Sequence, residues 1–270
     1  MVKKMRAVIL AAGMGTRMAH YTHSLPKGML KIGARSILQY NIDNLRNAGI
    51  NDITIITGYK SNMIDFKQVN YVHNSKFAET NMVHTLFCAE SLMDQDMIVS
   101  YGDIIYEPEV LQKLLQEKND FSVVIDDNWL ELWKQRSDNP LHDAETLKLN
   151  SEGYIIEIGS IPNDISHIES QYIGLIKFSK VGLILLKLFY DDLRKIRHRK
   201  EIIRHRNFDN LYMTDFLQLL IDQGNNVKGV RINNGWIEID TNNDYDTYQL
   251  MYHKGILDRF CDLDKIQNKT

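Results

Sequence analysis

Short apolar runs alternate with amphipathic stretches along most of the chain. Residues 7–10 and 53–57 have the length and composition of buried strands, and residues 36–48 between them carry apolar side chains at helical spacing before Gly49. Two strands joined through a helix pair in parallel, because a parallel connection needs a long crossover. The pattern therefore predicts an α/β fold.

The alternation continues towards the carboxyl terminus. We expect further strands at residues 70–73, 97–103, 121–127, 154–159, 171–178, 227–232 and 235–240, and further helices at residues 82–93, 108–116, 212–222 and 244–260. Open parallel sheets bind their ligands beyond the carboxyl ends of the strands. Polar residues that close these strands are therefore candidates for a functional site.

Composition narrows the class of protein. A chain of 270 residues can bury the core of one α/β domain, and a net charge of −3 gives no indication of nucleic acid or of a membrane surface. Cys88 and Cys261 form no Cys-x-x-Cys pair, which predicts reduced thiols in a cytoplasmic protein. No apolar run approaches the ~20 residues of a membrane span. We expect a protein without a signal peptide that binds small charged ligands.

The most specific motif follows the first strand. Residues 10–17 read Leu-Ala-Ala-Gly-Met-Gly-Thr-Arg, and such small residues let backbone N–H groups approach a ligand closely. A P-loop is excluded because no Gly-Lys pair is followed by a hydroxyl residue. A dinucleotide fingerprint is excluded because Met18 stands where the third glycine belongs. With the charges of Arg17 and Lys27, the loop predicts a cradle for a triphosphate that loses pyrophosphate.

This loop, followed by Pro26 and Lys27, resembles the signature of the nucleotidyltransferases that activate sugar phosphates and phosphocholine-like compounds. The resemblance runs from about residue 5 to residue 248. It implies an α/β fold with a Rossmann-like, mostly parallel sheet flanked by helices. We expect a single domain over residues 1–262, with an acceptor-binding subregion at about 126–210 and a C-terminal helix at 244–260.

The resemblance also implies roles for individual residues. Arg17 and Lys27 are the expected catalytic residues. The expected nucleotide-binding residues are Leu10, Ala11, Ala12, Gly13, Gly15, Thr16, Arg17, Asn81, Tyr101 and Gly102. His84 is a weaker candidate beside Asn81, and the other histidines are too scattered to predict a site.

Two strand-end carboxylates are the expected metal ligands. Asp103 closes one predicted strand and Asp240 closes the last one. Mg²⁺ prefers one or two carboxylates together with phosphate oxygens and water, and in the family such aspartates share the ion. Taken singly, Asp103 is also compatible with a helix N-cap and Asp240 with a turn or cap.

The middle of the chain is expected to bind the acceptor. Tryptophans near carboxylates either cage a cationic group through cation–π attraction or pack in the core. The expected acceptor-binding residues are Lys27, Asp126, Trp129, Glu145, Gln171, Tyr172 and Trp236. The basic run at 194–206 has the pattern of a solvated helix face, with an oligomer contact or an acceptor lid as alternatives; no nucleic acid is expected there.

Several segments resemble cytidylyltransferases that act on phosphocholine, phosphonates or phosphoglutamine in the modification of bacterial surface polysaccharide, including capsule biosynthesis. They are residues 80–86, 101–106, 126–133, 139–148 and 171–174. This implies CTP as nucleotide, Mg²⁺ as cofactor, and a small phosphorylated acceptor or phosphonate.

Three alternatives remain. The acceptor can instead be a sugar 1-phosphate, or the chain can be a catalytically silent nucleotide-binding module of the same fold. A metal-dependent glycosyltransferase is the third, although the Asp-x-Asp motif usual for that class is absent at the relevant strand end.

Overall fold

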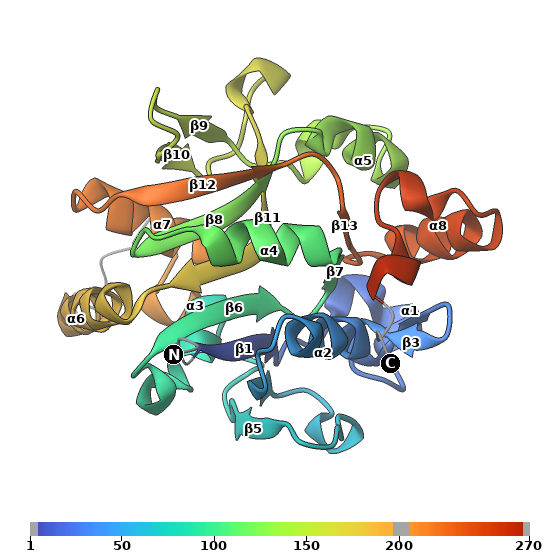
Figure 1. Ribbon diagram of the computed structural model, residues 1–270, viewed down its shortest axis with the longest axis horizontal. Coiled ribbons are helices and arrows are strands. Elements are labelled where there is room, and N and C mark those ends of the chain that lie inside the picture. The colour runs from blue at the N-terminus through green and yellow to red at the C-terminus, as the bar shows by residue number, and fades with distance from the viewer. Residues whose placement is uncertain (1–4, 197–205, 267–270) are drawn as a thin grey trace.

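A seven-stranded sheet forms the centre of the computed structural model, which describes residues 5–196 and 206–266 (Figure 1). The strand order is β12-β8-β11-β6-β1-β4-β5. The strands are β1 (Met5–Ala11), β4 (Asp52–Thr57), β5 (Asn70–His73), β6 (Asp96–Tyr101), β8 (Phe121–Asp126), β11 (Gln171–Phe178) and β12 (Val227–Ile232). Only β11 runs antiparallel to its neighbours, β6 and β8. The predicted α/β fold with a mostly parallel sheet is confirmed.

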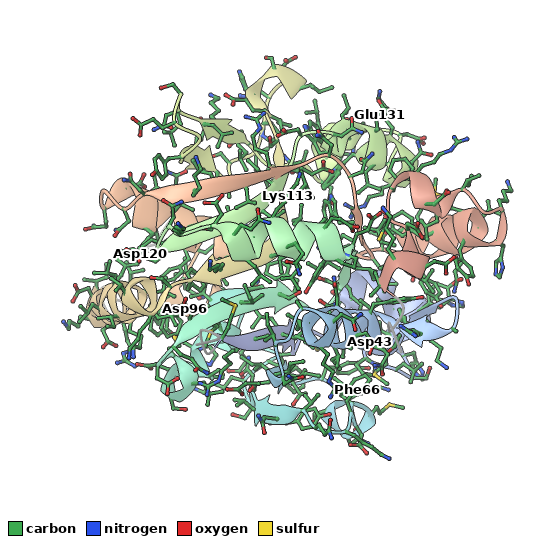
Figure 2. All side chains as sticks on the ribbon, viewed as in Figure 1. Asp43, Phe66, Asp96, Lys113, Asp120 and Glu131 are labelled. Carbon is green, nitrogen blue, oxygen red and sulfur yellow. The ribbon has the colours of Figure 1, made fainter. Side chains whose placement is uncertain are left out.

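Helices cover both faces of this sheet. One buried cluster contains side chains of α2 (Ile37–Asn47), α4 (Pro108–Gln116), α5 (Trp129–Arg136) and α8 (Asn242–His253). The other contains side chains of α3 (Met82–Phe87), α6 (Lys180–Ile196) and α7 (Met213–Asp222). Successive residues of β1 alternate between the clusters, as the pleat of a strand buried on both faces requires. Figure 2 shows side chains filling the space between sheet and helices.

Short two-stranded sheets complete the fold. They pair β2 (Lys31–Ile32) with β3 (Arg35–Ser36), β7 (Ile104–Tyr106) with β13 (Trp236–Glu238), and β9 (Leu147–Leu149) with β10 (Ile155–Ile158). In the β7–β13 pair, Glu238 lies opposite Ile104, and the N–H of Ile239 donates to the carbonyl of Asp103 at 3.0 Å. This pairing brings the turn after β6 beside the chain that leaves β13.

Local signals account for where the predicted helices begin and end. The Ser36 hydroxyl accepts a hydrogen bond from the N–H of Gln39 and caps α2, and Gly49, with a φ of +82°, follows its end. The predicted bounds of α4, β11 and β12 are confirmed. Thr241 and Asp244 form a capping box at the start of α8.

Other predicted bounds were wrong. The helix expected at 82–93 ends at Phe87, and Glu90–Leu92 forms a 3₁₀ turn. The helix expected at 244–260 spans Asn242–His253 instead, because Gly255 takes a φ of +65° that a continuing helix cannot accommodate. Helices α5 and α6 have no counterpart among the predicted elements.

Only part of the basic run at 194–206 lies within the described residues. Arg194 and Lys195 lie in the last turn of α6 and pair with Asp191 and Asp192, as the solvated-face interpretation predicts. The positions 197–205 lie outside the described residues, so that part of the prediction stays untested.

Two expectations from composition can be compared with the described residues. No helix in the described part of the chain is long and apolar enough to cross a membrane. Cys88 and Cys261 are free thiols. The boundaries predicted for the domain and for the acceptor-binding subregion stay predictions.

Candidate active site

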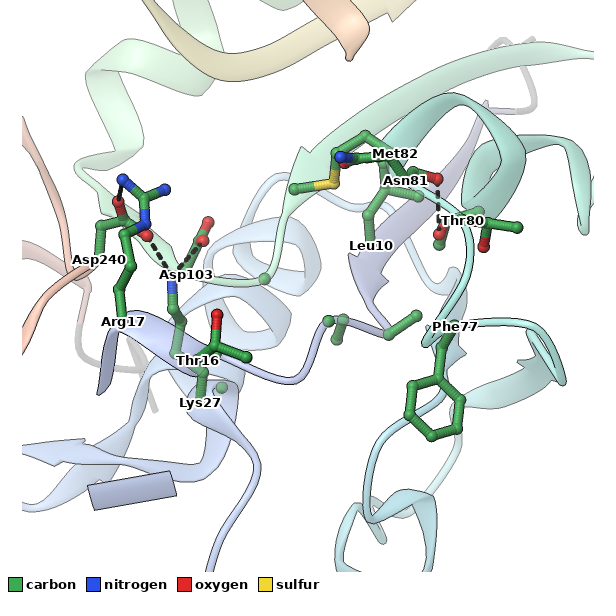
Figure 3. Close-up of a pocket in the computed structure, with 17 residues that line it drawn as sticks. Leu10, Thr16, Arg17, Lys27, Phe77, Thr80, Asn81, Met82, Asp103 and Asp240 are labelled. Atoms are coloured by element: carbon green, nitrogen blue, oxygen red, sulfur yellow. Dashed lines mark hydrogen bonds and ion pairs between the residues drawn. The ribbon is translucent and has the colours of Figure 1, made fainter. Parts of the chain in front are cut away.

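Two adjoining cavities lie at the carboxyl ends of the central strands. The smaller, which we call the loop cavity, has a volume of about 230 Å³ and is shown in Figure 3. The larger, which we call the broad cavity, has a volume of about 590 Å³. They share the residues Thr16, Arg17, Asn81, Met82, Asp103 and Asp240. A ligand in either cavity can therefore reach the charged groups of Arg17, Asp103 and Asp240.

The loop cavity gathers nearly all of the predicted nucleotide-binding residues. It is lined by Leu10, Ala11, Ala12, Gly13, Gly15, Thr16, Arg17, Lys27, Gly28, Phe77, Thr80, Asn81, Met82, Thr85, Gly102, Asp103 and Asp240. Tyr101 is the exception, since it lines the broad cavity. Sequence reasoning missed Gly28, Phe77, Thr80, Met82 and Thr85. Thr80, Met82 and Thr85 lie in the same segment as Asn81, residues 80–86, whereas no motif marks Phe77.

Glycines allow the loop to pack closely at the ends of the strands. Gly15 takes a φ of +61°, and its carbonyl accepts a hydrogen bond from the Thr22 hydroxyl at 3.0 Å. At Gly102, an added Cβ would lie 2.8 Å from the carbonyl oxygen of Leu10. The turn after β6 can therefore approach the end of β1 only with glycine at this position.

Lys27 lies between the two predicted metal ligands. Its Nζ is 2.8 Å from Oδ2 of Asp103 and 2.9 Å from Oδ1 of Asp240, as the dashed lines in Figure 3 show. Burial alone would lower the pKa of the Lys27 ammonium, but the charges and hydrogen bonds of the two carboxylates outweigh it and raise this pKa above its ordinary value. Lys27 is thus a fixed positive charge at neutral pH.

Arg17 supplies the second positive charge. Its Nη1 is 2.5 Å from Oδ2 of Asp240 and 3.2 Å from Oδ1 of Asp143. Burial would raise the pKa of the Asp240 carboxyl, but the charges of Lys27 and Arg17 outweigh it and lower this pKa, so Asp240 is ionised. The Arg17 side chain is 60% exposed, which lets it reach a ligand at the mouth of both cavities.

The start of α8 fixes the backbone around Asp240. Oδ2 of Asp244 accepts hydrogen bonds from the N–H of Asp240 at 3.0 Å and from that of Thr241 at 2.8 Å. A negative charge beside a helix N-terminus is also stabilised by the helix dipole. Together with the β7–β13 pairing, this cap holds Asp240 beside Asp103, although the two residues are 137 positions apart in the sequence.

The carboxylates fit a Mg²⁺ site. Oδ1 of Asp103 is buried and has no hydrogen-bond partner among the described residues, although buried carboxylate oxygens normally have one. No group of three or more His, Cys, Asp or Glu side chains suited to a metal occurs at residues 5–196 and 206–266. A pair of carboxylates nevertheless suffices for Mg²⁺ when substrate phosphates supply further oxygens.

The broad cavity is acidic and aromatic. Beyond the shared residues, its walls include Tyr101, Trp133, Asp143, Glu145, Gln171, Tyr172, Ile173, Gly174, Tyr212, Met213, Thr214 and Glu238. Three of the predicted acceptor-binding residues, Glu145, Gln171 and Tyr172, come together here. Oε1 of Glu145 accepts a hydrogen bond from the Thr214 hydroxyl at 3.3 Å, and the Gln171 amide bonds to the N–H and carbonyl of Glu145.

Electrostatics in the broad cavity favour a cationic ligand group. Burial raises the pKa of Glu238 to about 8, and the neighbouring charges of Asp240, Asp103 and Asp143 add to this shift, while Arg136 opposes it. Carboxylates crowded in this way gain stability when a positive charge joins them.

Asp126, Trp129 and Trp236 line neither cavity. Asp126 is fully buried, and its carboxylate accepts hydrogen bonds from Nε1 of Trp236 at 2.9 Å and from the N–H groups of Asn128 and Asn234. Trp129 and Trp236 are core residues, so the packing alternative describes them and the cage does not. Trp133, one turn after Trp129, belongs to the same buried cluster and also lines the broad cavity.

Three charged residues near the site were not predicted as functional: Arg136, Asp143 and Glu238. Alternation along β13 could have indicated Glu238, because residues two apart in a strand share a face and Asp240 was already a candidate. Arg136 and Asp143 come together only through the fold of the segment around α5, which no periodicity marks.

Comparison with known proteins identifies the family. A family profile described as MobA-like NTP transferase domain matches residues 7–141. The CTP:phosphoglutamine cytidylyltransferase of Campylobacter jejuni is 43% identical over 247 residues, covering 87% of this chain and 96% of the relative. The choline-phosphate cytidylyltransferase of Streptococcus pneumoniae is 30% identical over 127 residues, covering 46% of this chain and 55% of the relative.

A solved structure shows the same architecture. The CTP:phosphocholine cytidylyltransferase of Streptococcus pneumoniae superposes with a TM-score of 0.69 at 21% identity, covering 92% of this chain and 99% of that one. At this identity the likeness concerns the fold alone. Given the profile match, the identity to the Campylobacter relative and the loop cavity, the chain belongs to the nucleotidyltransferases with a MobA-like NTP transferase domain.

Proposed function

We propose that this nucleotidyltransferase is a Mg²⁺-dependent cytidylyltransferase of the cytoplasm that transfers CMP from CTP to a small phosphorylated acceptor or phosphonate, for the modification of cell-surface polysaccharide. The observation that carries the proposal is the cluster of Arg17, Lys27, Asp103 and Asp240 where the two cavities meet. The choice of CTP is supported by the two relatives from Campylobacter jejuni and Streptococcus pneumoniae, which are cytidylyltransferases by name.

In the proposed reaction an oxygen of the acceptor's phosphorus group forms a bond to the α-phosphorus of CTP. The bond from the α-phosphorus to the bridging oxygen breaks, and pyrophosphate leaves with the electron pair. An ionised phosphate oxygen is already a nucleophile, so this chain needs no general base. Catalysis then consists of positioning the reactants and stabilising negative charge, which are the tasks of Lys27 and Arg17.

Asp103 and Asp240 would hold Mg²⁺ together with phosphate oxygens. The ion would supply neutralisation of triphosphate charge in the transition state. Because Lys27 contacts both carboxylates, its ammonium stays next to the phosphates that it serves.

The acceptor is proposed to carry a positively charged nitrogen as well as its phosphorus group. Phosphoglutamine, phosphocholine and aminoalkylphosphonates share this feature. The support is the wall of the broad cavity, which contains the side chains of Glu145 and Glu238 together with the ring of Tyr172. Carboxylates give a cation its counter-charge, and aromatic faces add cation–π attraction.

A pyrophosphate-release assay tests the function. Each of the four nucleoside triphosphates is combined with phosphoglutamine, phosphocholine, 2-aminoethylphosphonate and glucose 1-phosphate. We expect turnover with CTP and an amine-bearing acceptor. Turnover only with the sugar phosphate would contradict the proposed acceptor, and nucleotide binding without turnover of any pair would indicate a silent module.

The substitution Asp103→Asn tests the metal assignment. We expect it to lower Mg²⁺-dependent turnover by about 100-fold or more, because half of the proposed carboxylate pair is lost at a site of developing charge. Asp138→Asn is the matched control, since Asp138 is exposed and lines neither cavity. Unchanged turnover in Asp103→Asn would show that the metal is held elsewhere.

A further inference from the structure

Arg136 is a buried cation outside both cavities. It lies in the last turn of α5, and its side chain is 4% exposed. Its guanidinium contacts three carboxylates: Nε lies 3.2 Å from Asp244, Nη2 lies 3.3 Å from Asp143, and Nη1 lies 3.0 Å from Glu238. The guanidinium also lies over the ring of Trp133, at 4.7 Å from its centre. With so many partners, the position of Arg136 is strongly determined.

Asp143 connects this buried cation to the loop cavity. One of its oxygens, Oδ2, binds Arg136, and the other, Oδ1, binds Nη1 of Arg17 at 3.2 Å. The exposed side chain of Arg17 would otherwise sample many rotamers, at a large cost in entropy on binding a ligand. A carboxylate that is itself anchored reduces this freedom.

The contacts of Arg17 leave one edge of its guanidinium open. Both Asp143 and Asp240 contact the same nitrogen, Nη1. In the part of the chain that the structure describes, no hydrogen bond or ion pair with the protein engages Nε or Nη2. An arginine binds a phosphate best with two parallel N–H groups from one edge. Asp143 therefore orients Arg17 without occupying the edge that a triphosphate would use.

We propose that Asp143, anchored by Arg136, is the positioning residue that orients Arg17 towards the triphosphate, and so links the segment around α5 to the nucleotide loop. The inference rests on the proposed role of Arg17 at the triphosphate. Arg17 lines both cavities and Lys27 lines the loop cavity, so both can turn towards a ligand. Arg136 lines neither cavity and keeps Asp143 in place when Arg17 turns.

A double-mutant cycle tests the proposal. Binding of a non-hydrolysable CTP analogue is measured by calorimetry for the full-length wild type, Asp143→Asn, Arg17→Ala and the double variant. Removing a negative charge near a triphosphate tightens binding whether Arg17 is present or replaced by alanine. The readout is therefore the ratio between the changes in affinity that Asp143→Asn causes in these two backgrounds. For each background we compare the affinity for the analogue with and without Asp143→Asn. We expect this change in affinity to be about tenfold less favourable when Arg17 is present than when residue 17 is alanine.

Two further variants separate positioning from general loss of structure. Arg136→Lys keeps the charge but loses the planar guanidinium, whose three nitrogens each contact a different carboxylate, and we expect it to reduce the Asp143–Arg17 coupling at least twofold. Asp138→Asn makes the same chemical change as Asp143→Asn on the same segment, and we expect no coupling to Arg17. Thermal melting of each variant checks that it is folded; the Asp143 side chain is 40% exposed, whereas that of Arg136 is 4% exposed, so Asp143→Asn is expected to fold even where Arg136→Lys does not.

The outcomes distinguish this inference from the proposed function. A ratio near one would overturn the positioning role, and so would an inverted ratio, which would mean that Asp143 competes with phosphate for Arg17. If Arg17→Ala itself leaves binding of the analogue unchanged, the proposed role of Arg17 fails and the inference fails with it. If Arg17→Ala weakens binding of the analogue but shows no coupling to Asp143→Asn, the inference is overturned while the proposed role of Arg17 stands.

Discussion

Strand-end aspartates in this protein have different roles because their neighbours differ. Asp103 and Asp240 meet Lys27, a cation that lines the loop cavity. Asp126 ends β8 in a similar sequence context, yet it meets only N–H donors of the protein and is fully buried. A carboxylate whose oxygens are satisfied inside the protein stabilises the fold, while one that faces a cavity beside a cation can serve a ligand.

Asp126 is expected to stabilise the fold through the hydrogen bonds that it accepts. Asp126→Ala leaves the Trp236 indole N–H and two backbone N–H groups without an acceptor, and we expect a loss of about 3 kcal/mol in the free energy of unfolding. Urea denaturation measures it. Asp138→Ala, an exposed aspartate, should cost less than about 0.5 kcal/mol. A loss as small as this in Asp126→Ala would contradict the stabilising role assigned to the hydrogen bonds that Asp126 accepts.

The pH dependence of the same site has a definite sign. Burial is the main cause that raises the pKa of Asp126, and the hydrogen bonds it accepts oppose this shift. The folded state therefore takes up the proton at higher pH than the unfolded chain, where the pKa is about 3.9. Relative to the non-titrating Asp126→Asn variant, the wild type should lose stability as the pH rises from about 3.9 through the raised pKa, and the difference should then stay constant.

At the scale of elements, regular patterns were predictable from the sequence and irregular ones were not. The central strands and the loop at residues 10–17 follow from apolar runs and from the spacing of glycines. The pairing of β7 with β13 does not, because a strand of three residues carries no periodicity and its partner lies far along the chain. Asp143 was not predicted for a similar reason. Its two cationic partners, Arg17 and Arg136, come from separate parts of the chain, and only the fold brings them together.

Two glycines of the loop cavity, Gly13 and Gly102, are expected to serve different purposes, ligand binding for the first and packing of the fold for the second. A Cβ on Gly13 would have no atom within 4 Å, and Gly13 lines the loop cavity. We therefore expect Gly13→Ala to leave the melting temperature unchanged but to weaken binding of the CTP analogue by about tenfold, since the methyl group enters the space of the ligand.

Gly102→Ala provides the contrast to Gly13→Ala. Its Cβ would lie 2.8 Å from a backbone oxygen, so we expect it to lower the free energy of unfolding by about 1–3 kcal/mol. Calorimetry and denaturation of both variants measure the two effects. Normal binding by Gly13→Ala would mean that the ligand does not approach this part of the loop closely.

On the scale of the whole molecule, the two cavities extend to different parts of the sheet, and the proposed function would place the nucleotide in the loop cavity and the acceptor in the broad cavity. The loop cavity lies at the carboxyl ends of β1 and β6, and the broad cavity extends towards β11 and α7. Arg17, Asp103 and Asp240 belong to both, which places the proposed phosphoryl chemistry at the boundary. Residues that line one cavity alone and contact none of these shared charged groups should therefore affect one substrate only.

Glu145 gives the sharpest test of this division, because it lines the broad cavity alone. In Glu145→Gln the side chain keeps its size but loses the charge proposed to face the cationic group of the acceptor. We expect KM for an amine-bearing acceptor to rise by about tenfold while the affinity for the CTP analogue is unchanged. Glu152→Gln, on an exposed turn outside both cavities, is the matched control. If Glu145→Gln weakened the nucleotide and the acceptor equally, the cavities would not be separate sites; if it weakened neither, the positive group of the acceptor would have to lie against Glu238 instead.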